Sequence, residues 1–303
     1  NPILAGDLAV AYRLALRAEG VVHLPPLPVQ YADYAVWQRA CVEQGAMARQ
    51  LDHWNRHLGA DVPALDLPTD RARPAQKSFA GRTLGFDLPP TLAAALQKLC
   101  RAEKCTPFVM LLAAWQVLLA RYSGQDDFAV GVPNAGRQQE EVHGLLGFFV
   151  TTQVFRARLA PRRSLREIWR QVRTDALAAL DNADLPFELL LASRKDRRDP
   201  ARSPLFQVMF SAQMLDGDAA LDLEGLRAEA VEFEEAGAKF DLSLDFYLDP
   251  QRVHGRLEYN TDLFDEATAL RLSGYYRCVL EAFVVEPERA LGELQLPGDT
   301  EHA

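Results

Sequence analysis

The amino-acid sequence predicts an α/β fold with a mixed sheet, on three grounds. From residue 79 onward, segments of alternating apolar residues take turns with segments whose apolar residues recur every three or four positions, as is typical of α/β folds. The later strand segments follow one another without helices between them, which favours a mixed sheet over a purely parallel one. The 303 residues, 49% of them hydrophobic, suffice for a sizeable core.

The N-terminal quarter is predicted to consist of helices joined by extended, proline-rich segments. Apolar residues three and four apart over residues 3–15 predict an amphipathic helix. A longer helical pattern covers 31–58, with an interruption near Gly45. The segments 23–28 and 61–74 are rich in proline, which removes a backbone donor and disfavours helix in the preceding residue.

The remaining chain supplies the sheet and its covering helices. Strands are predicted near 80–88, 127–132, 148–158, 205–213, 227–234, 239–248 and 252–260, and helices near 90–103, 107–122, 164–181 and 265–285. The helix from Pro107 has a well-marked start, because Thr106 can cap it and proline suits the first turn.

Composition excludes several functions. A net charge of -9 argues against nucleic acid as a partner, since phosphate binding needs a basic face. The longest apolar runs, such as residues 111–120, are shorter than the roughly 20 residues of a membrane span. The cysteines, at positions 41, 100, 105 and 278, show no CxxC pairing. Together with the lack of a signal peptide, this predicts a cytoplasmic protein with reduced thiols and no membrane contact.

No self-contained catalytic or metal-binding motif occurs. GxSxG, GxxxxGK[ST], GxGxxG and HExxH are all absent. His53 and His57 have the spacing of metal ligands on a helix, but no third ligand accompanies them, so no metal site is predicted. His143, in a loop, could act as an acid or base, although a solvated or capping histidine is the simpler interpretation.

Four local clusters stand out from the background. They are YADYAVW at 31–37, GLLGFFVTTQVFR at 144–156, NADLPFE at 182–188 and RKDRRDPARSPL at 194–205. Taken alone, the first is interpreted as an aromatic stripe packed in a core, and the glycines of the second as places of close approach. The third indicates a helix end followed by a new helix start. The fourth is a basic loop on an acidic chain, where an acidic partner could dock.

In this order and at these separations, the clusters resemble the condensation domains of nonribosomal peptide synthetases. The family patterns YxDYAVW, GxFVNT, (H/N)QDxPFE and RDxSRxPL stand here as YADYAVW, GFFVTTQ, NADLPFE and RDPARSPL. The resemblance implies a chloramphenicol acetyltransferase-like αβ sandwich, with two subdomains in a V and a tunnel between them. It also implies peptide bond formation between a donor acyl thioester and an acceptor amine. Both would be carried on the 4'-phosphopantetheine of carrier proteins, with no cofactor bound by the chain itself.

The family's HHxxxDG motif, whose second histidine assists attack by the acceptor amine, is absent from this sequence. The helix near residue 3 resembles the helix that follows the motif. We therefore expect residues 1–75 to be a remnant of the N-terminal subdomain with crossover helices, and 76–303 to be the C-terminal subdomain. No catalytic residue is assigned, and the isolated chain is expected to be inactive. A natural degenerate relative is the alternative to a truncated domain.

The resemblance assigns supporting roles to individual residues. Arg137 resembles the arginine that pairs with the aspartate of HHxxxDG, so here we expect it to face solvent or a substitute acid. The active-site support group is Arg137, Thr151, Gln153, Asn182 and Asp184. The inter-subdomain bracing group is Tyr31, Asp33 and Trp37. Thr151, Ala183 and Ala201 replace the family's usual asparagine, glutamine and serine, so substrate positioning at these points is altered.

Partners follow from the same resemblance. Carrier proteins and adjacent synthetase domains are expected, and so is the missing N-terminal subdomain or, in its place, self-association. The possible carrier-protein contact comprises Arg194, Lys195, Arg197, Arg198 and Arg202. Two alternatives stay open: a carrier-protein-binding module without catalysis, and an epimerisation or heterocyclisation relative.

Overall fold

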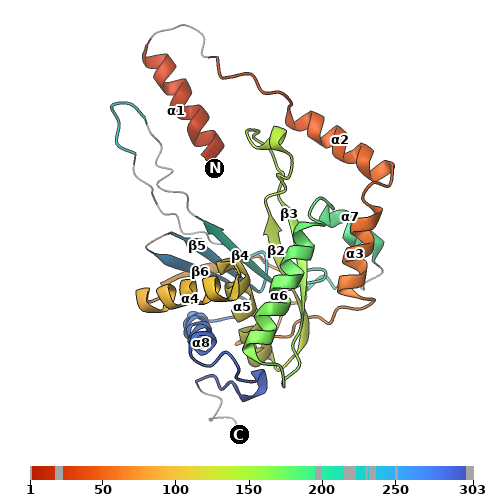
Figure 1. The fold of residues 1–303 in the computed structure, drawn as a ribbon, viewed down its shortest axis with the longest axis vertical. Coiled ribbons are helices and arrows are strands. Elements are labelled where there is room, and N and C mark those ends of the chain that lie inside the picture. Colours follow the sequence, from red (N-terminus) through yellow and green to blue (C-terminus); the bar gives the residue numbers. More distant parts are fainter. Residues whose placement is uncertain are drawn as a thin grey trace.

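A computed structural model contains one mixed sheet of six strands (Figure 1), as the sequence predicts. It describes residues 2–17, 23–194, 199–214, 223–228, 231, 237–249 and 252–297. The strands are β1 (Gly81–Asp87), β2 (Asp127–Asn134), β3 (Thr151–Arg158), β4 (Val208–Met214), β5 (Leu242–Leu248) and β6 (Val253–Asn260), in the spatial order β1-β6-β5-β4-β2-β3. The strand β4 runs parallel to β2 and β5, and all other neighbours are antiparallel.

Eight α-helices are described within these ranges. They are α1 (Pro2–Leu16), α2 (Tyr31–Glu43), α3 (Ala48–Leu58), α4 (Pro90–Glu103), α5 (Pro107–Ser123), α6 (Leu165–Leu180), α7 (Phe187–Ser193) and α8 (Glu266–Val285). The helical pattern over 31–58 forms two helices, because the chain turns at Gly45 with a φ of 72°. The strand predicted at 227–234 falls largely outside the described residues.

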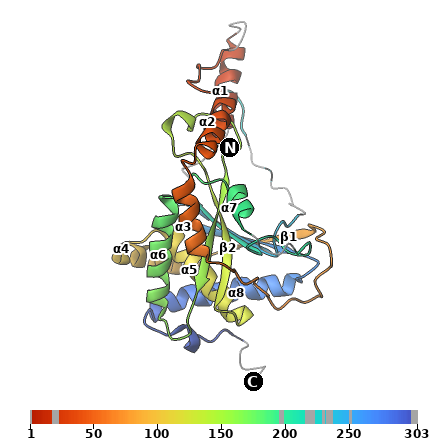
Figure 2. The same ribbon diagram turned by 90° about the vertical axis from the view of Figure 1, so that its right-hand side faces the viewer.

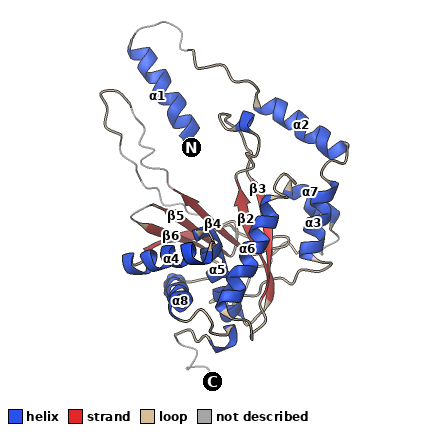
Figure 3. Ribbon diagram, in the orientation of Figure 1, coloured by secondary structure: helices blue, strands red, loops and turns tan. Residues whose placement is uncertain are grey.

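The helix α5 forms the centre of the core. Every residue from Val109 to Ala120 is buried, as expected for a helix covered on all sides. The helices α4, α6 and α8 pack around it, and β4 contacts it from the sheet. Figures 2 and 3 show this layer of helices beside the strands. Thr106 caps α5 as predicted, with its Oγ1 accepting a hydrogen bond from the Val109 N–H at 3.3 Å.

The N-terminal helices extend beyond this body (Figures 1 and 2). The predicted amphipathic helix forms as α1, but Ala9 is its one buried residue among those described. Leu4, Leu8 and Leu16 are all exposed. The expected helix is therefore present, whereas the apolar face that should be covered lies open to solvent.

The proline-rich segment 59–74 is held in place by hydrogen bonds to side chains that are distant in sequence. The guanidinium of Arg202 donates to the Leu65 carbonyl at 3.1 Å and to Asp66 at 2.8 Å. Gln207 accepts from the Leu65 N–H at 2.7 Å. An extended proline-rich segment forms no regular backbone–backbone hydrogen bonds of its own. Hydrogen bonds from side chains therefore satisfy its backbone N–H and carbonyl groups.

None of the described helices, taken singly, is long and apolar enough to cross a bilayer. The helices α4 and α5 together pass on length and composition, but they are bent by 108° to each other. The four cysteines are free thiols.

Candidate functional site

The candidate site lies where the loop 135–150 between β2 and β3 meets the turn after α6. The clusters at 31–37, 144–156 and 182–188 all contribute to it, although they are far apart in sequence. The fourth cluster does not, because its described part holds the segment 59–66 instead.

Helix α2 is fastened to the loop by aromatic side chains. The Tyr31 hydroxyl donates to the Phe148 carbonyl at 2.9 Å, and the Tyr31 ring stands edge-on to Phe149 with centroids 5.1 Å apart. A side chain at Gly147 would place its Cβ 2.3 Å from the Tyr31 ring. Close approach at a glycine of this cluster is thus observed, but the approaching group is the Tyr31 side chain and not the backbone or ligand that the glycine pattern allows.

The other residues of the first cluster differ from expectation. Tyr34 packs on Phe149 with centroids 4.8 Å apart, and Trp37 contacts Tyr34. None of the α2 residues is buried, so the interpretation as a core stripe was wrong. Asp33 serves its own helix, because its carboxylate accepts from the Gln30 N–H at 2.8 Å. A bracing role between subdomains stays a prediction.

Arg137 occupies a different environment from the one expected. Its guanidinium lies 4.3 Å from the centre of the Phe149 ring and donates to the Val142 carbonyl. It is partly exposed and pairs with no acid among the described residues, while an aromatic face and a carbonyl oxygen both attract the cation. His143 Nε2 lies 3.1 Å from the Arg137 carbonyl, so His143 helps to hold this loop.

The turn after α6 is organised by helix α3. The amide of Gln50 accepts from the backbone N–H groups of Asp184 and Leu185 at 3.1 and 3.0 Å, and it donates to the Asp184 carboxylate at 3.1 Å. Trp54 Nε1 donates to the Asn182 carbonyl at 2.9 Å. The sequence patterns did not single out Gln50 or Trp54. Their only sequence signal is their spacing of four residues on one helix.

The remaining predicted site residues point their polar groups at backbone. Asn182 Nδ2 donates to the Ala178 carbonyl at 2.8 Å. Thr151 Oγ1 reaches the Leu185 carbonyl at 3.5 Å, and Gln153 Nε2 donates to the Ala179 carbonyl at 2.9 Å. The structure thus brings Thr151, Gln153, Asn182 and Asp184 to one place, with Arg137 on the adjoining loop.

A cavity of about 350 Å³ opens beside this turn. It is lined by Lys104, Cys105, Thr106, Phe108, Val109, Val132, Pro133, Asn134, Ala135, Gln153, Phe155, Arg173, Ala176, Leu177, Leu180 and Ala212. We call it the α5–α6 cavity. Its walls are mostly apolar and its charged groups are Lys104 and Arg173, while the described residues add no histidine or carboxylate to the lining. Such a cavity can hold and orient a ligand, but this lining includes no ordinary acceptor for the proton of an attacking amine.

The pKa values of two ionisable groups near the site differ from their usual values. Contact with the Cys100 thiol, with a further contribution from Arg173, lowers the pKa of Cys105 in the cavity wall. Burial, followed by the proximity of Asp184, raises the pKa of Tyr34.

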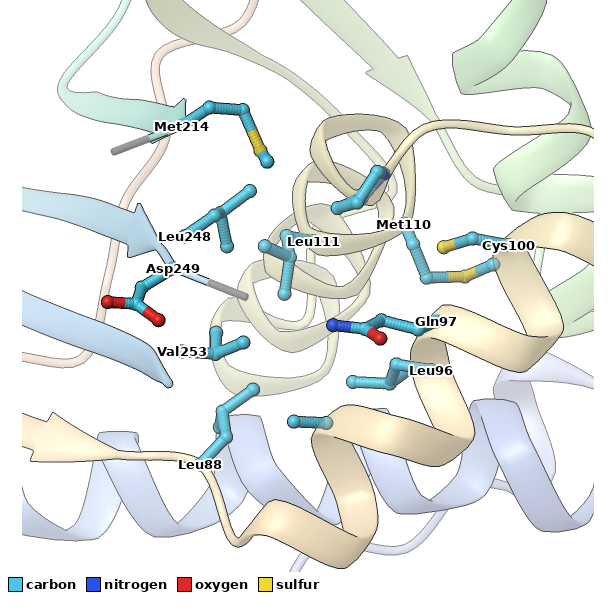
Figure 4. A pocket seen from close by; sticks show the side chains of 12 residues that line it. Leu88, Leu96, Gln97, Cys100, Met110, Leu111, Met214, Leu248, Asp249 and Val253 are labelled. Carbon is cyan, nitrogen blue, oxygen red and sulfur yellow. The ribbon is translucent and has the colours of Figure 1, made fainter. Parts of the chain in front are cut away.

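A second, smaller cavity of about 90 Å³ lies on the other side of the α4–α5 corner (Figure 4). Figure 4 shows Leu88, Leu111, Leu248 and Val253 directed into it. Cys100 lines this cavity and Cys105 lines the α5–α6 cavity, so the corner forms a thin wall between them.

The basic cluster is only partly described. Arg194 donates to the carbonyls of Gly59 and Ala60 at 2.9 and 3.3 Å, and Arg202 is bound to 65–66. These two arginines bind the chain's own backbone, and a carrier-protein contact through them stays a prediction. Lys195, Arg197 and Arg198 lie outside the described residues.

The histidine pair has no metal-site geometry. Within the described ranges, no group of three or more His, Cys, Asp or Glu residues could hold a metal ion. His57 Nε2 accepts from the Arg156 N–H at 3.3 Å. Burial, reinforced by the neighbouring His53, lowers the pKa of His57 to about 4.

The sequence and fold of this chain are similar to those of known proteins. The family model for the condensation domain matches residues 1–303. A linear gramicidin synthase of Brevibacillus parabrevis is 42% identical over 97% of the chain, and malpinin synthetase of Mortierella alpina is 37% identical over 90%. The chain spans only 4% of the length of each of these two relatives.

Solved structures agree with this match. The X-domain from teicoplanin biosynthesis superposes with a TM-score of 0.87 at 27% identity, covering 98% of this chain and 68% of that one. The condensation domain from the Monacolin K polyketide synthase has a TM-score of 0.80 at 22% identity, covering 95% and 68%, and shows the fold alone. The chain therefore belongs to the condensation domain family of nonribosomal peptide synthetases and has the chloramphenicol acetyltransferase-like fold.

Proposed function

We propose that the chain forms one wall of a site that joins a donor acyl thioester to the amine of an acceptor aminoacyl group. Both substrates would be carried on the 4'-phosphopantetheine arms of carrier proteins. The observation that carries this proposal is the α5–α6 cavity, whose lining includes Gln153 and Phe155 from the 144–156 cluster, one of the four that resemble the family patterns. Amine attack on a thioester gains most from holding two tethered reactants together, which a preformed cavity does.

The histidine would come from a part of the domain that has no counterpart in this chain. The match covers 68% of the teicoplanin X-domain chain, which leaves about a third of that chain unmatched. Large apolar side chains are exposed on α1 (Leu4 and Leu8), on α2 (Val36 and Trp37) and on the loop 135–150 (Phe148), and we refer to them together as the exposed apolar face. Exposed apolar area of this kind marks an interface, and we assign it to contact with the subdomain that carries HHxxxDG.

Restoring the missing part tests the proposal. The chain is fused to the N-terminal segment, including HHxxxDG, of a condensation domain from a linear gramicidin synthase, and is supplied with donor and acceptor carrier proteins. Dipeptidyl product, detected by mass spectrometry, is expected from the fusion but not from the chain alone. Replacing the second histidine of the motif with alanine is the matched control. Product from the isolated chain would refute the assignment of the catalytic group.

A further inference from the structure

The side chain of Gln153 places an amide in the lining of the α5–α6 cavity. Gln153 is 6% exposed and lines the cavity from strand β3. Its Nε2 donates to the Ala179 carbonyl at 2.9 Å. Because a carbonyl oxygen can only accept, this bond fixes the orientation of the amide. It leaves Oε1 as the atom that Gln153 offers to the cavity, and none of the described residues donates to it.

The rest of the lining restricts what can meet this oxygen. The rings of Phe108 and Phe155 stand 6.3 Å apart at 66° in the wall, and Leu177 and Leu180 are exposed beside them. An apolar group of aromatic size suits these surfaces. A small hydroxylated side chain would leave them uncovered.

The charges of the cavity exclude a cationic donor. Lys104 and Arg173 line it, and none of the described carboxylates does. Arg173 is held in place because its NH1 donates to the Glu103 carbonyl at 2.9 Å. A ligand ammonium group would be repelled by both cations, whereas a neutral N–H or O–H is not. The same two cations would attract an anionic group, but an anion has no proton to donate to Oε1.

From this lining we infer that the α5–α6 cavity takes an aromatic side chain carrying one neutral hydrogen-bond donor, of the indole or phenol type, and that Gln153 Oε1 accepts that donor. The inference rests on the proposed function for the statement that the occupant is an aminoacyl group. A buried acceptor that a ligand covers but does not satisfy is costly, so Gln153 makes the cavity selective against aromatic groups that lack a donor.

Matched neutral ligands test the inference by titration calorimetry on the whole chain. N-acetyl-L-tryptophanamide is compared with N-acetyl-1-naphthylalaninamide, and N-acetyl-L-tyrosinamide with N-acetyl-L-phenylalaninamide. The donor-bearing member of each pair is expected to bind about ten times more tightly, as one added hydrogen bond permits. Gln153→Leu should remove the preference. Gln97→Leu, in the second cavity, should leave it intact.

A second measurement needs no variant, in case Gln153→Leu fails to fold. The side-chain amide resonance of Gln153 should shift on addition of the tryptophan ligand and not of its naphthyl counterpart. Equal binding within both pairs, a preference that survives Gln153→Leu, or no binding at all would overturn the inference. Because no carrier protein or histidine motif takes part, these outcomes are independent of whether the fused domain forms peptide bonds.

Discussion

At the scale of single residues, the turn after α6 depends on two side chains of α3. Trp54, which is 3% exposed, satisfies the Asn182 carbonyl, and Gln50 satisfies two successive N–H groups. These bonds link residues more than 120 positions apart. The positions of Asn182 and Asp184 therefore depend on α3 as well as on local bonds such as that from Asn182 to the Ala178 carbonyl.

Removing the indole donor should destabilise this turn. In Trp54→Phe the Asn182 carbonyl loses its partner while the ring volume is nearly kept, so we expect a loss of about 1–3 kcal/mol in the free energy of unfolding. Urea denaturation measures it. Trp37→Phe is the control, because Trp37 is partly exposed on α2; equal losses in both variants would contradict the role given to Trp54.

His57 should make the fold sensitive to mild acid. Folding lowers its pKa from 6.5 to about 4. Below pH 6.5 the imidazole is therefore protonated in the unfolded chain but remains neutral in the folded chain. The free energy of unfolding therefore keeps the full contribution of His57 above pH 6.5. This contribution declines as the pH falls, and up to about 3 kcal/mol of it is lost near pH 4. Unfolding measured across this range should show a flatter profile for His57→Gln. His143→Gln, at an exposed position, should keep the wild-type slope.

Residue-level prediction from the sequence succeeded where the chemistry is local. The Thr106 cap needs only the next three residues, and it is present. The environment of Arg137 could not be anticipated, because it depends on Phe149 folding back across the loop. Likewise, nothing near Arg194 and Arg202 in sequence indicates that they bind residues 59–66.

At the scale of elements, most helices and strands were predictable because their apolar periodicity is strong. The helix α4 begins and ends at the predicted residues, and β5 and β6 differ by a few positions at most. The strand order was not predictable. It depends on pairings such as Gly81 with Asn260, which no local pattern specifies.

The segment 59–74 offers a matched pair of arginines. Arg73 is paired with Asp241, which is 2% exposed, whereas Arg71 pairs with Asp265 at a half-exposed position. Arg73→Ala leaves a buried carboxylate without its partner and should cost about 3–5 kcal/mol. Arg71→Ala should cost at most about 1 kcal/mol. Thermal unfolding of both variants checks the difference, and similar losses would show that Asp241 is stabilised in another way.

At the scale of the whole molecule, the exposed apolar face governs behaviour in solution. Phe148 is 80% exposed and Val36 71% exposed, and both belong to the region around α2 and the loop 135–150. Exposed apolar surface of this extent promotes association. The isolated chain is therefore expected to form dimers or larger species as its concentration rises.

Sedimentation velocity measures this association. Phe148→Ser should shift the distribution toward monomer, because it removes the most exposed aromatic ring of the face. Leu270→Ser, which alters a single exposed leucine on α8, should not. A chain that stays monomeric at all concentrations would be incompatible with the interface assigned to this face.

The pairing of β1 with β6 also affects how the chain is made. Gly81 pairs with Asn260, so β1 leaves the ribosome long before its partner has been synthesised. At about 5–20 residues per second, the delay is roughly 10–35 s. During that time β1 has no neighbour in the sheet, and the nascent chain must keep an unpaired strand from sticking to others. A chaperone that shields this region during translation would raise the yield of folded protein.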